Sequence, residues 1–129
     1  MLQIRLTSIM VDDQDKALAF YTTVMGFEKK LDFPVSGPFR WITVASPALP
    51  DVHLALEPNE NPAGRTFQKA LFDQGIPATA FHSTDIDADY ARLTAAGVAF
   101  TMPPTMMGPV KAAILSDTVG NLIQIYQPS

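Results

Sequence analysis

The chain contains no cysteine, and this absence excludes several kinds of chemistry at once. Without thiols there can be no disulfide framework, zinc ribbon, iron–sulfur cluster or thiolate nucleophile. The sequence also lacks any apolar run approaching the roughly eighteen residues of a membrane-spanning helix. Its first residues pass directly into strand-like sequence, without the charged and apolar regions of a signal peptide. We therefore expect a cytoplasmic protein without a membrane partner.

Charge is scarce, and positive charge is scarcer than negative charge. Nine Lys and Arg residues against thirteen Asp and Glu residues give a formal net charge of -4. This balance repels phosphate polymers, so nucleic acid is not an expected partner. Charged residues make up only 17% of the chain, below the roughly 25% typical of soluble domains. Apolar surface covered by a second copy would explain the low value, so we expect a homodimer.

The pattern of apolar residues predicts secondary structure over most of the 129 residues. In the first half, period-two alternation and turn residues predict strands, and helical spacing followed by Gly26 predicts one helix. The expected order is a strand at 4–11, a helix at 16–25 and strands at 27–33, 40–45 and 52–56. A short connecting helix is expected at about 61–75, because proline follows Asn61 at its first turn.

The second half repeats this order. It has a strand at 78–84, a helix that begins after the cap 85–87 and ends at Gly97, and strands at 98–102, 110–115 and 122–126. Matching Val11-Asp12 with Thr84-Asp85 superposes the two halves. An internal repeat of this size predicts two similar modules related by a pseudo-two-fold axis. We predict an α+β fold in which two βαβββ modules, about 1–58 and about 76–129, form a curved mixed sheet around a cleft.

Two stretches carry a resemblance to a known family. The run 11–21, followed by Val24-Met25-Gly26-Phe27, and the run 117–126 near the end of the chain resemble the vicinal-oxygen-chelate superfamily, which includes glyoxalases, bleomycin-resistance proteins and extradiol dioxygenases. With the duplication, the resemblance covers essentially the whole chain. It implies the paired-module fold and a small molecule bound in the cleft.

The resemblance also implies where a metal would be held. In metal-dependent members, ligands come from the first and last strands of each module, and these places fall here on Leu6, Ala55, Thr79 and Gln124. Only Gln124 offers a usable donor, whereas such sites need several N and O donors converging on one ion. We therefore expect no metal and no other cofactor. The chain looks closer to members that bind or sequester small molecules.

Strand alternation selects the side chains that would line the cleft. The expected ligand-binding residues are Ser8, Met10, Trp41, His53, Phe81, Met106, Lys111, Gln124 and Tyr126. Trp41 and Lys111 in particular suit an aromatic or anionic small molecule, through stacking and charge-assisted hydrogen bonds. Arg40 points away from Trp41 and so cannot share its face. Met106 belongs to a methionine-rich, proline-rich connection that either covers the cleft or fills the core.

His53 and Glu57 are weak candidates for an acid–base role. They lie on one side of a strand but about 13 Å apart, too far to hold one ion. His53 is equally compatible with a purely structural role. His82 is expected to face away from the cleft, unless a strand bulge inverts its direction.

The leading hypothesis is thus a metal-independent small-molecule-binding protein. A lyase, isomerase or dioxygenase of the same superfamily, with a non-standard metal site or with His53 and Glu57 as acid and base, is the first alternative. An interaction domain with a filled cleft is the second. Sequence reasoning leaves these three open, because one scaffold hosts many functions.

Overall fold

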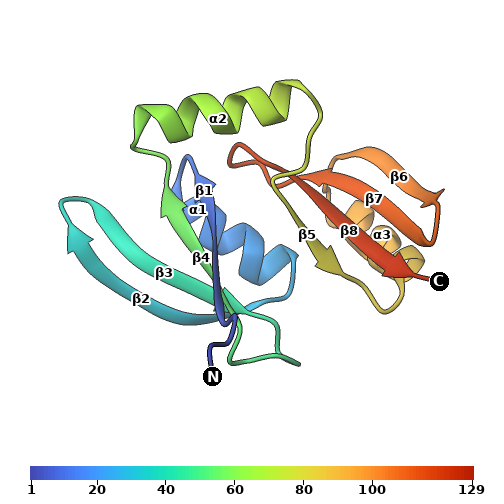
Figure 1. Cartoon of the computed structure of the whole chain (residues 1–129), viewed down its shortest axis with the longest axis horizontal. Helices are drawn as coiled ribbons and strands as arrows, with labels where there is room; N and C mark the ends of the chain where they lie inside the picture. The colour runs from blue at the N-terminus through green and yellow to red at the C-terminus, as the bar shows by residue number, and fades with distance from the viewer. The chain divides into compact units, whose positions relative to one another are not determined.

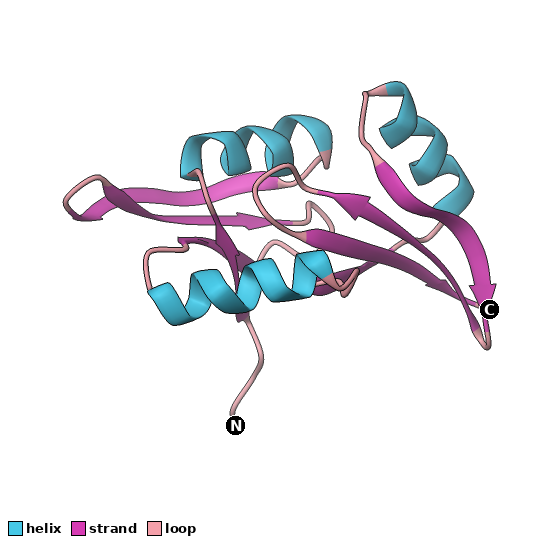
Figure 2. Cartoon of the chain, turned by 90° about the horizontal axis from the view of Figure 1, so that it is seen from above, coloured by secondary structure: helices cyan, strands magenta, loops and turns pink.

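The computed structural model describes residues 1–129, and the chain divides into two compact units, residues 1–65 and 66–129. Each unit contains one layer of four strands with a helix against one side (Figure 1 and Figure 2). The predicted α+β class and the two βαβββ modules are confirmed. No helix of the chain is both long enough and apolar enough to cross a membrane.

Unit 1 (residues 1–65) has the strand order β1-β4-β3-β2. Its elements are β1 (Leu6–Val11), α1 (Gln14–Ala19), a π-helical continuation η1 (Phe20–Val24), β2 (Glu28–Ser36), β3 (Phe39–Ala45) and β4 (His53–Pro58). β1 and β4 run parallel, and the other neighbours are antiparallel. The helix covers one side of the sheet, and the core between them is formed by Ile9, Val11, Ala17, Phe20, Tyr21, Ile42, Val44, Leu54 and Leu56.

Unit 2 (residues 66–129) repeats this topology with the order β5-β8-β7-β6. It contains β5 (Thr79–His82), α3 (Ile86–Ala95), β6 (Phe100–Met107), β7 (Val110–Ser116) and β8 (Leu122–Pro128). Its core between the sheet and α3 is formed by Ile86, Leu93, Ala113, Leu115, Ile123 and Ile125. The helix α2 (Pro62–Asp73) begins in unit 1 and continues into unit 2.

Matching caps start the two module helices. Asp13 accepts a hydrogen bond from the Lys16 amide at 3.0 Å, and Asp85 accepts one from the Ala88 amide at 3.1 Å. The equivalent residues are therefore Asp13 and Asp85. Matching Asp12 with Asp85, as the sequence suggested, shifts each residue of β1 against β5 by one. A shift of one residue turns every side chain of a strand to the opposite face.

Two strands are longer than their proline content suggested. β2 includes Pro34, and β6 includes Pro103 and Pro104, which we expected in loops. Both strands are the outer strands of their sheets, where one edge makes no hydrogen bonds to a neighbour. A proline lacks a backbone N–H and is tolerated at such an edge. The expected long connection around Met106 is therefore part of an edge strand.

Candidate ligand-binding faces

Each sheet has one side away from its own helix. We define the unit 1 open face as the side of β1–β4 opposite α1. Strand register places on it the side chains of Leu6, Ser8, Met10, Leu31, Phe33, Trp41, Thr43, Ala45, His53, Ala55 and Glu57. The sequence predicted Ser8, Met10, Trp41 and His53 for a ligand-contacting face, and all four lie on this side.

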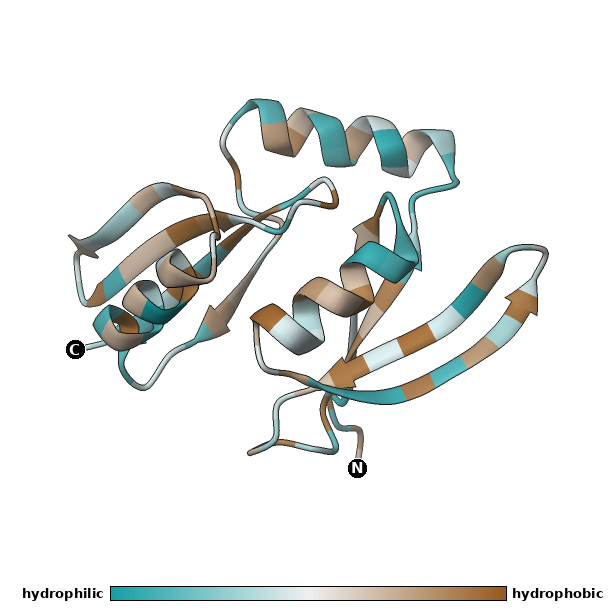
Figure 3. Ribbon diagram, turned by 180° about the vertical axis from the view of Figure 1, so that it is seen from behind, coloured by the Kyte–Doolittle hydropathy of each residue, from teal (hydrophilic) through white to brown (hydrophobic).

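Apolar groups dominate the accessible part of the unit 1 open face. Leu6, Leu31 and Phe33 are 52%, 41% and 48% exposed, and Trp41 is half-buried. Phe33 lies directly opposite Trp41 in the β2–β3 register. Hydrophobic and hydrophilic residues alternate along this hairpin (Figure 3), as expected for strands with two different faces. The hairpin thus offers an apolar surface on which the side chains of Phe33 and Trp41 occupy neighbouring positions.

His53 is held in place by Thr43. The Thr43 hydroxyl and the His53 Nδ1 atom are 3.0 Å apart, across neighbouring strands of the open face. In the neutral tautomer with its proton on Nε2, the Thr43 hydroxyl donates to Nδ1, so Nε2 remains to meet a ligand. Glu57 lies on the same face of β4 but four residues further along the strand, about 13 Å from His53. The pair is therefore too far apart to act on one atom.

The first turn of α2 reaches the unit 1 open face at Met10. A Cβ atom added at Gly64 would lie 2.7 Å from the Met10 sulfur atom. The missing side chain at Gly64 lets the Met10 side chain approach the helix backbone closely. Met10 is therefore half-buried beneath the first turn of α2 and is not freely accessible.

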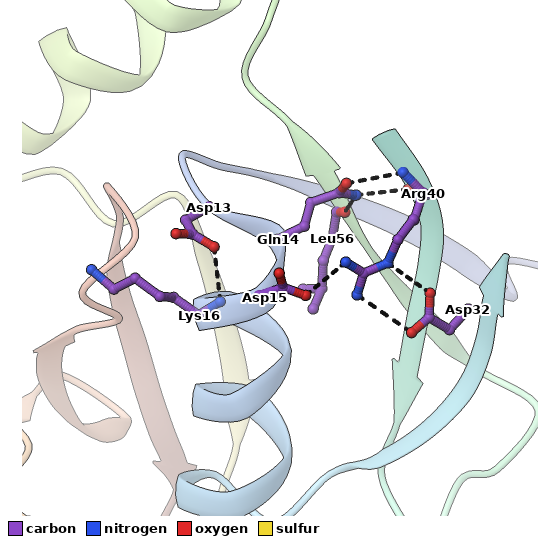
Figure 4. A network of polar contacts seen from close by, with 7 residues as sticks. All are labelled: Asp13, Gln14, Asp15, Lys16, Asp32, Arg40 and Leu56. Atoms are coloured by element: carbon purple, nitrogen blue, oxygen red, sulfur yellow. Dashed lines mark hydrogen bonds and ion pairs between the residues drawn. The ribbon is translucent and has the colours of Figure 1, made fainter. Parts of the chain in front are cut away.

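The side chain of Gln14 lies between β3 and β4. Its Nε2 atom donates to the carbonyl oxygens of Arg40, at 2.7 Å, and Leu56, at 2.9 Å, while its Oε1 atom accepts from the Arg40 amide at 3.0 Å (Figure 4). The residue is only 9% exposed. Its amide replaces direct strand-to-strand hydrogen bonds at the end of the sheet where Trp41 and Glu57 lie. Residue Gln14 acts as a built-in spacer between the two strands.

Arg40 lies on the α1 side of the sheet and not on the open face. Its guanidinium donates to Asp32 at 2.9 Å and to Asp15 on α1 at 2.6 Å (Figure 4). The hydrogen bond to Asp32, and next that to Asp15, raise the pKa of Arg40 above its ordinary value. The group therefore fastens α1 to β2 and β3, and it is not available to a ligand on the open face.

Lys111 in unit 2, like Arg40 in unit 1, lies on the helix side of its sheet. This corrects our expectation that Lys111 lines the ligand-contacting face. In the β7–β8 register it lies opposite Gln127, in the row that faces α3, and its Nζ atom is 2.8 Å from Asp87 on that helix. Because Lys111 follows the α3 side, it does not line the face that carries Tyr126. The expectation of an anionic ligand rested on this residue, and it loses that support.

We define the unit 2 open face as the side of β5–β8 opposite α3. Register places on it the side chains of Ala80, His82, Met102, Thr105, Ala112, Ile114, Gln124 and Tyr126. Gln124 and Tyr126 were predicted for such a face. His82 was not, yet it lies beside Tyr126, with ring centroids 5.6 Å apart and the rings nearly perpendicular. This edge-to-face arrangement gives unit 2 its own aromatic surface.

Phe81 and Met106 lie on the other side. Phe81 is opposite Ile125, which faces the α3 core, so its predicted place in a ligand-contacting face is wrong. The one-residue shift between the repeats explains this error. It also explains why His82 was wrongly expected to face away from the ligand-contacting side. Met106 lies opposite Lys111, on the α3 side, and lines a cavity of about 250 Å³ with Asp87 and Gln127.

Neither unit brings together three His, Asp or Glu side chains that could hold a metal ion. Of the four places implied by the family resemblance, Leu6, Ala55 and Gln124 lie on open faces, while Thr79 faces α3. The three side chains on the open faces supply only the amide group of Gln124, which is a poor donor set for a catalytic ion.

Sequence reasoning missed three features of the unit 1 open face. Leu31 and Phe33 were recognisable as every second residue of β2, had the strand been extended past Phe33. Thr43 alternates with Trp41 and was recognisable in the same way. Gln14 left no such signal, because a polar residue near a helix start normally faces solvent.

Comparison with known proteins agrees with this architecture. The family model of the glyoxalase/bleomycin resistance protein/dioxygenase superfamily matches residues 3–125. The uncharacterized protein YurT of Bacillus subtilis (strain 168) is 54% identical over 127 residues, covering 98% of this chain and 99% of that protein.

Two solved structures are similar over nearly their whole length. UcmS2 has a TM-score of 0.83 and 30% identity, covering 98% of each chain. TnmS3, described as an antibiotic binding protein from Streptomyces sp. CB03234, has a TM-score of 0.79 and 32% identity, covering 100% of this chain and 98% of its own.

Proposed function

Because the chain belongs to the glyoxalase/bleomycin resistance protein/dioxygenase superfamily, we propose that it is a small-molecule-binding protein that works without a bound metal. The observation that carries this proposal is the unit 1 open face, where Leu6, Leu31 and Phe33 stay exposed beside Trp41. Exposed contiguous apolar surface in a folded protein marks an interaction site. The similarity to an antibiotic binding protein supports a small molecule as the occupant.

The chemistry of the face favours a planar, largely apolar ligand. Phe33 and Trp41 present adjacent rings, and such rings gain from stacking with another aromatic system. His53 offers Nε2 as a polar contact that would fix the orientation of a bound molecule. The separation of His53 from Glu57 argues against a joint acid–base reaction, so binding accounts for the face more simply than catalysis.

Binding can be tested with the chain's own tryptophan. Trp41 is the only tryptophan in the sequence, so the tryptophan fluorescence comes entirely from this face. We expect acridone, a neutral molecule of three fused rings, to quench Trp41 and to raise the melting temperature. A panel of planar aromatic molecules of which none does either would refute the proposal.

A matched pair of leucines controls this experiment. Leu31→Ala should weaken acridone binding by about fivefold, because the apolar contact area on the face is lost. Leu49→Ala removes the same atoms from a residue that is 61% exposed in the β3–β4 loop, outside the face, and should leave binding unchanged. Equal effects of the two substitutions would place the ligand elsewhere.

We further propose that the working form is a cytoplasmic homodimer. The low charge content and the exposed residues Leu2 and Ile4, which directly precede the outer strand β1, support an apolar contact with a second copy. An unprotected edge strand with apolar side chains is normally covered in a folded protein.

A further inference from the structure

Glu57 is a carboxylate without a partner on a mostly apolar face. It is half-buried, and it takes part in none of the chain's ion pairs or side-chain hydrogen bonds. The other acidic side chains, apart from Asp12 and Glu60, cap a helix, accept a hydrogen bond or pair with a base. Asp12 and Glu60 are exposed in the loops after β1 and β4, so Glu57 alone combines partial burial with the open face.

No basic side chain pairs with Glu57. Arg65, in the first turn of α2, donates instead to the carbonyl oxygens of Asn59, at 3.2 Å, and Glu60, at 3.4 Å. Arg40 and Lys29 lie in the rows that face α1, opposite Pro34 and Val44. The bulged residue Lys30 pairs with Glu28 at 3.5 Å, at the start of β2. The unit 1 open face therefore presents a negative charge to whatever binds there, and it would repel a carboxylate or sulfonate brought onto it.

Trp41 and Glu57 lie on neighbouring strands, β3 and β4. β3 and β4 pair through Thr43 and Ala55, and two residues further along each strand are Trp41 and Glu57, on the same face. At that point the strands are held apart by the amide of Gln14. An indole face and a free carboxylate thus border the same widened end of the sheet. Both groups attract organic cations, one through its ring quadrupole and the other through its charge.

We propose that the unit 1 open face selects planar aromatic cations, with the ring system on Phe33 and Trp41 and a positively charged N–H group at Glu57. This inference rests on the proposed binding function and adds charge selection to it. The ligand's cation supplies the partner that Glu57 lacks within the chain.

Three ring systems of similar size and different charge test the inference by isothermal titration calorimetry: aminoacridine, which is cationic, acridone, which is neutral, and anthraquinone sulfonate, which is anionic. At low salt we expect aminoacridine to bind about fivefold more tightly than acridone, as for one partly exposed ion pair. The sulfonate should bind more weakly than acridone. The preference for aminoacridine should shrink as salt is raised.

Substitution of two nearby glutamates separates a local contact from the general field. Glu57→Gln should remove the preference, so that aminoacridine binds this variant no more tightly than acridone binds the same variant. Glu60→Gln removes the same charge from the adjacent loop and should keep the preference. A preference that survives Glu57→Gln, or that disappears equally in both variants, would overturn the assignment to Glu57.

The failure of this inference is distinguishable from failure of the binding function. If all three molecules bind with equal affinity, the charge selection is wrong and the binding function stands. If the protein binds none of them and no other planar aromatic molecule of the panel, both are wrong.

Discussion

Gly120 is a position where one missing side chain decides local packing. It has a φ of +105° in the turn before β8, and a Cβ atom there would lie 2.7 Å from Gln68 Nε2 on α2. Gln68 donates to the Asn121 side chain at 3.2 Å, and Asn121 in turn donates to the fully buried Asp117. The turn and the second half of α2 therefore form one buried polar network within unit 2.

We predict that Gly120→Ala destabilises the protein more than Gly97→Ala. Both glycines have positive φ, +105° and +91°, but a Cβ at Gly97 would meet nothing within 4 Å. Backbone strain should cost about 1–2 kcal/mol at Gly97, and the contact with Gln68 should add at least about 1 kcal/mol at Gly120. Urea denaturation measures both. Equal losses would mean that Gln68 moves aside freely.

At the scale of elements, Gln14 distinguishes the two sheets. The β7–β8 ladder continues from Val110 to Ser116, whereas the β3–β4 ladder is limited to Thr43 to Ala45. The difference begins where the Gln14 amide bonds to Arg40 and Leu56. Ile86, buried at the equivalent place after the Asp85 cap of unit 2, cannot form such bonds. One side-chain amide thus separates two strands that otherwise would pair along their length.

Replacement of Gln14 by glutamate should be strongly destabilising at neutral pH. A carboxylate cannot donate to the two carbonyl oxygens, so buried acceptors would face a buried charge, with an expected loss of about 3 kcal/mol. Gln127→Glu is the control, because the Gln127 Oε1 atom only accepts, from the Ile86 amide at 2.8 Å. Thermal and urea unfolding of both variants check this prediction, and a Gln14→Glu protein as stable as the control would contradict the spacer role.

For the whole molecule, we predict a metal-free dimer by native mass spectrometry. The mass should be twice that of the chain, because the apolar edge of β1 needs a covering partner. Zinc, nickel or manganese should neither bind stoichiometrically nor raise the melting temperature, because neither unit assembles three suitable donors. A monomer would refute the proposed assembly. A stoichiometric metal would return His53, Glu57, His82 and Gln124 to consideration as ligands.

The family, the α+β class, the repeat and the sheet side of Ser8, Met10, Trp41 and His53 were predictable from local sequence patterns. Strong alternation and helix caps such as Asp13 and Gly26 are local signals, and they predict local structure and the face of a residue such as Trp41.

Other features depend on exact strand register and on contacts between residues that are distant in sequence, and these emerged from the folded chain. Phe81 and His82 exchanged faces because a shift of one residue inverts a strand, and two consecutive aspartates matched the cap equally well. Lys111 turned to Asp87, and Gln14 entered the sheet, through partners that are remote along the chain. The free carboxylate of Glu57 could also be recognised only in the folded chain, because the sequence does not show which side chains come near it.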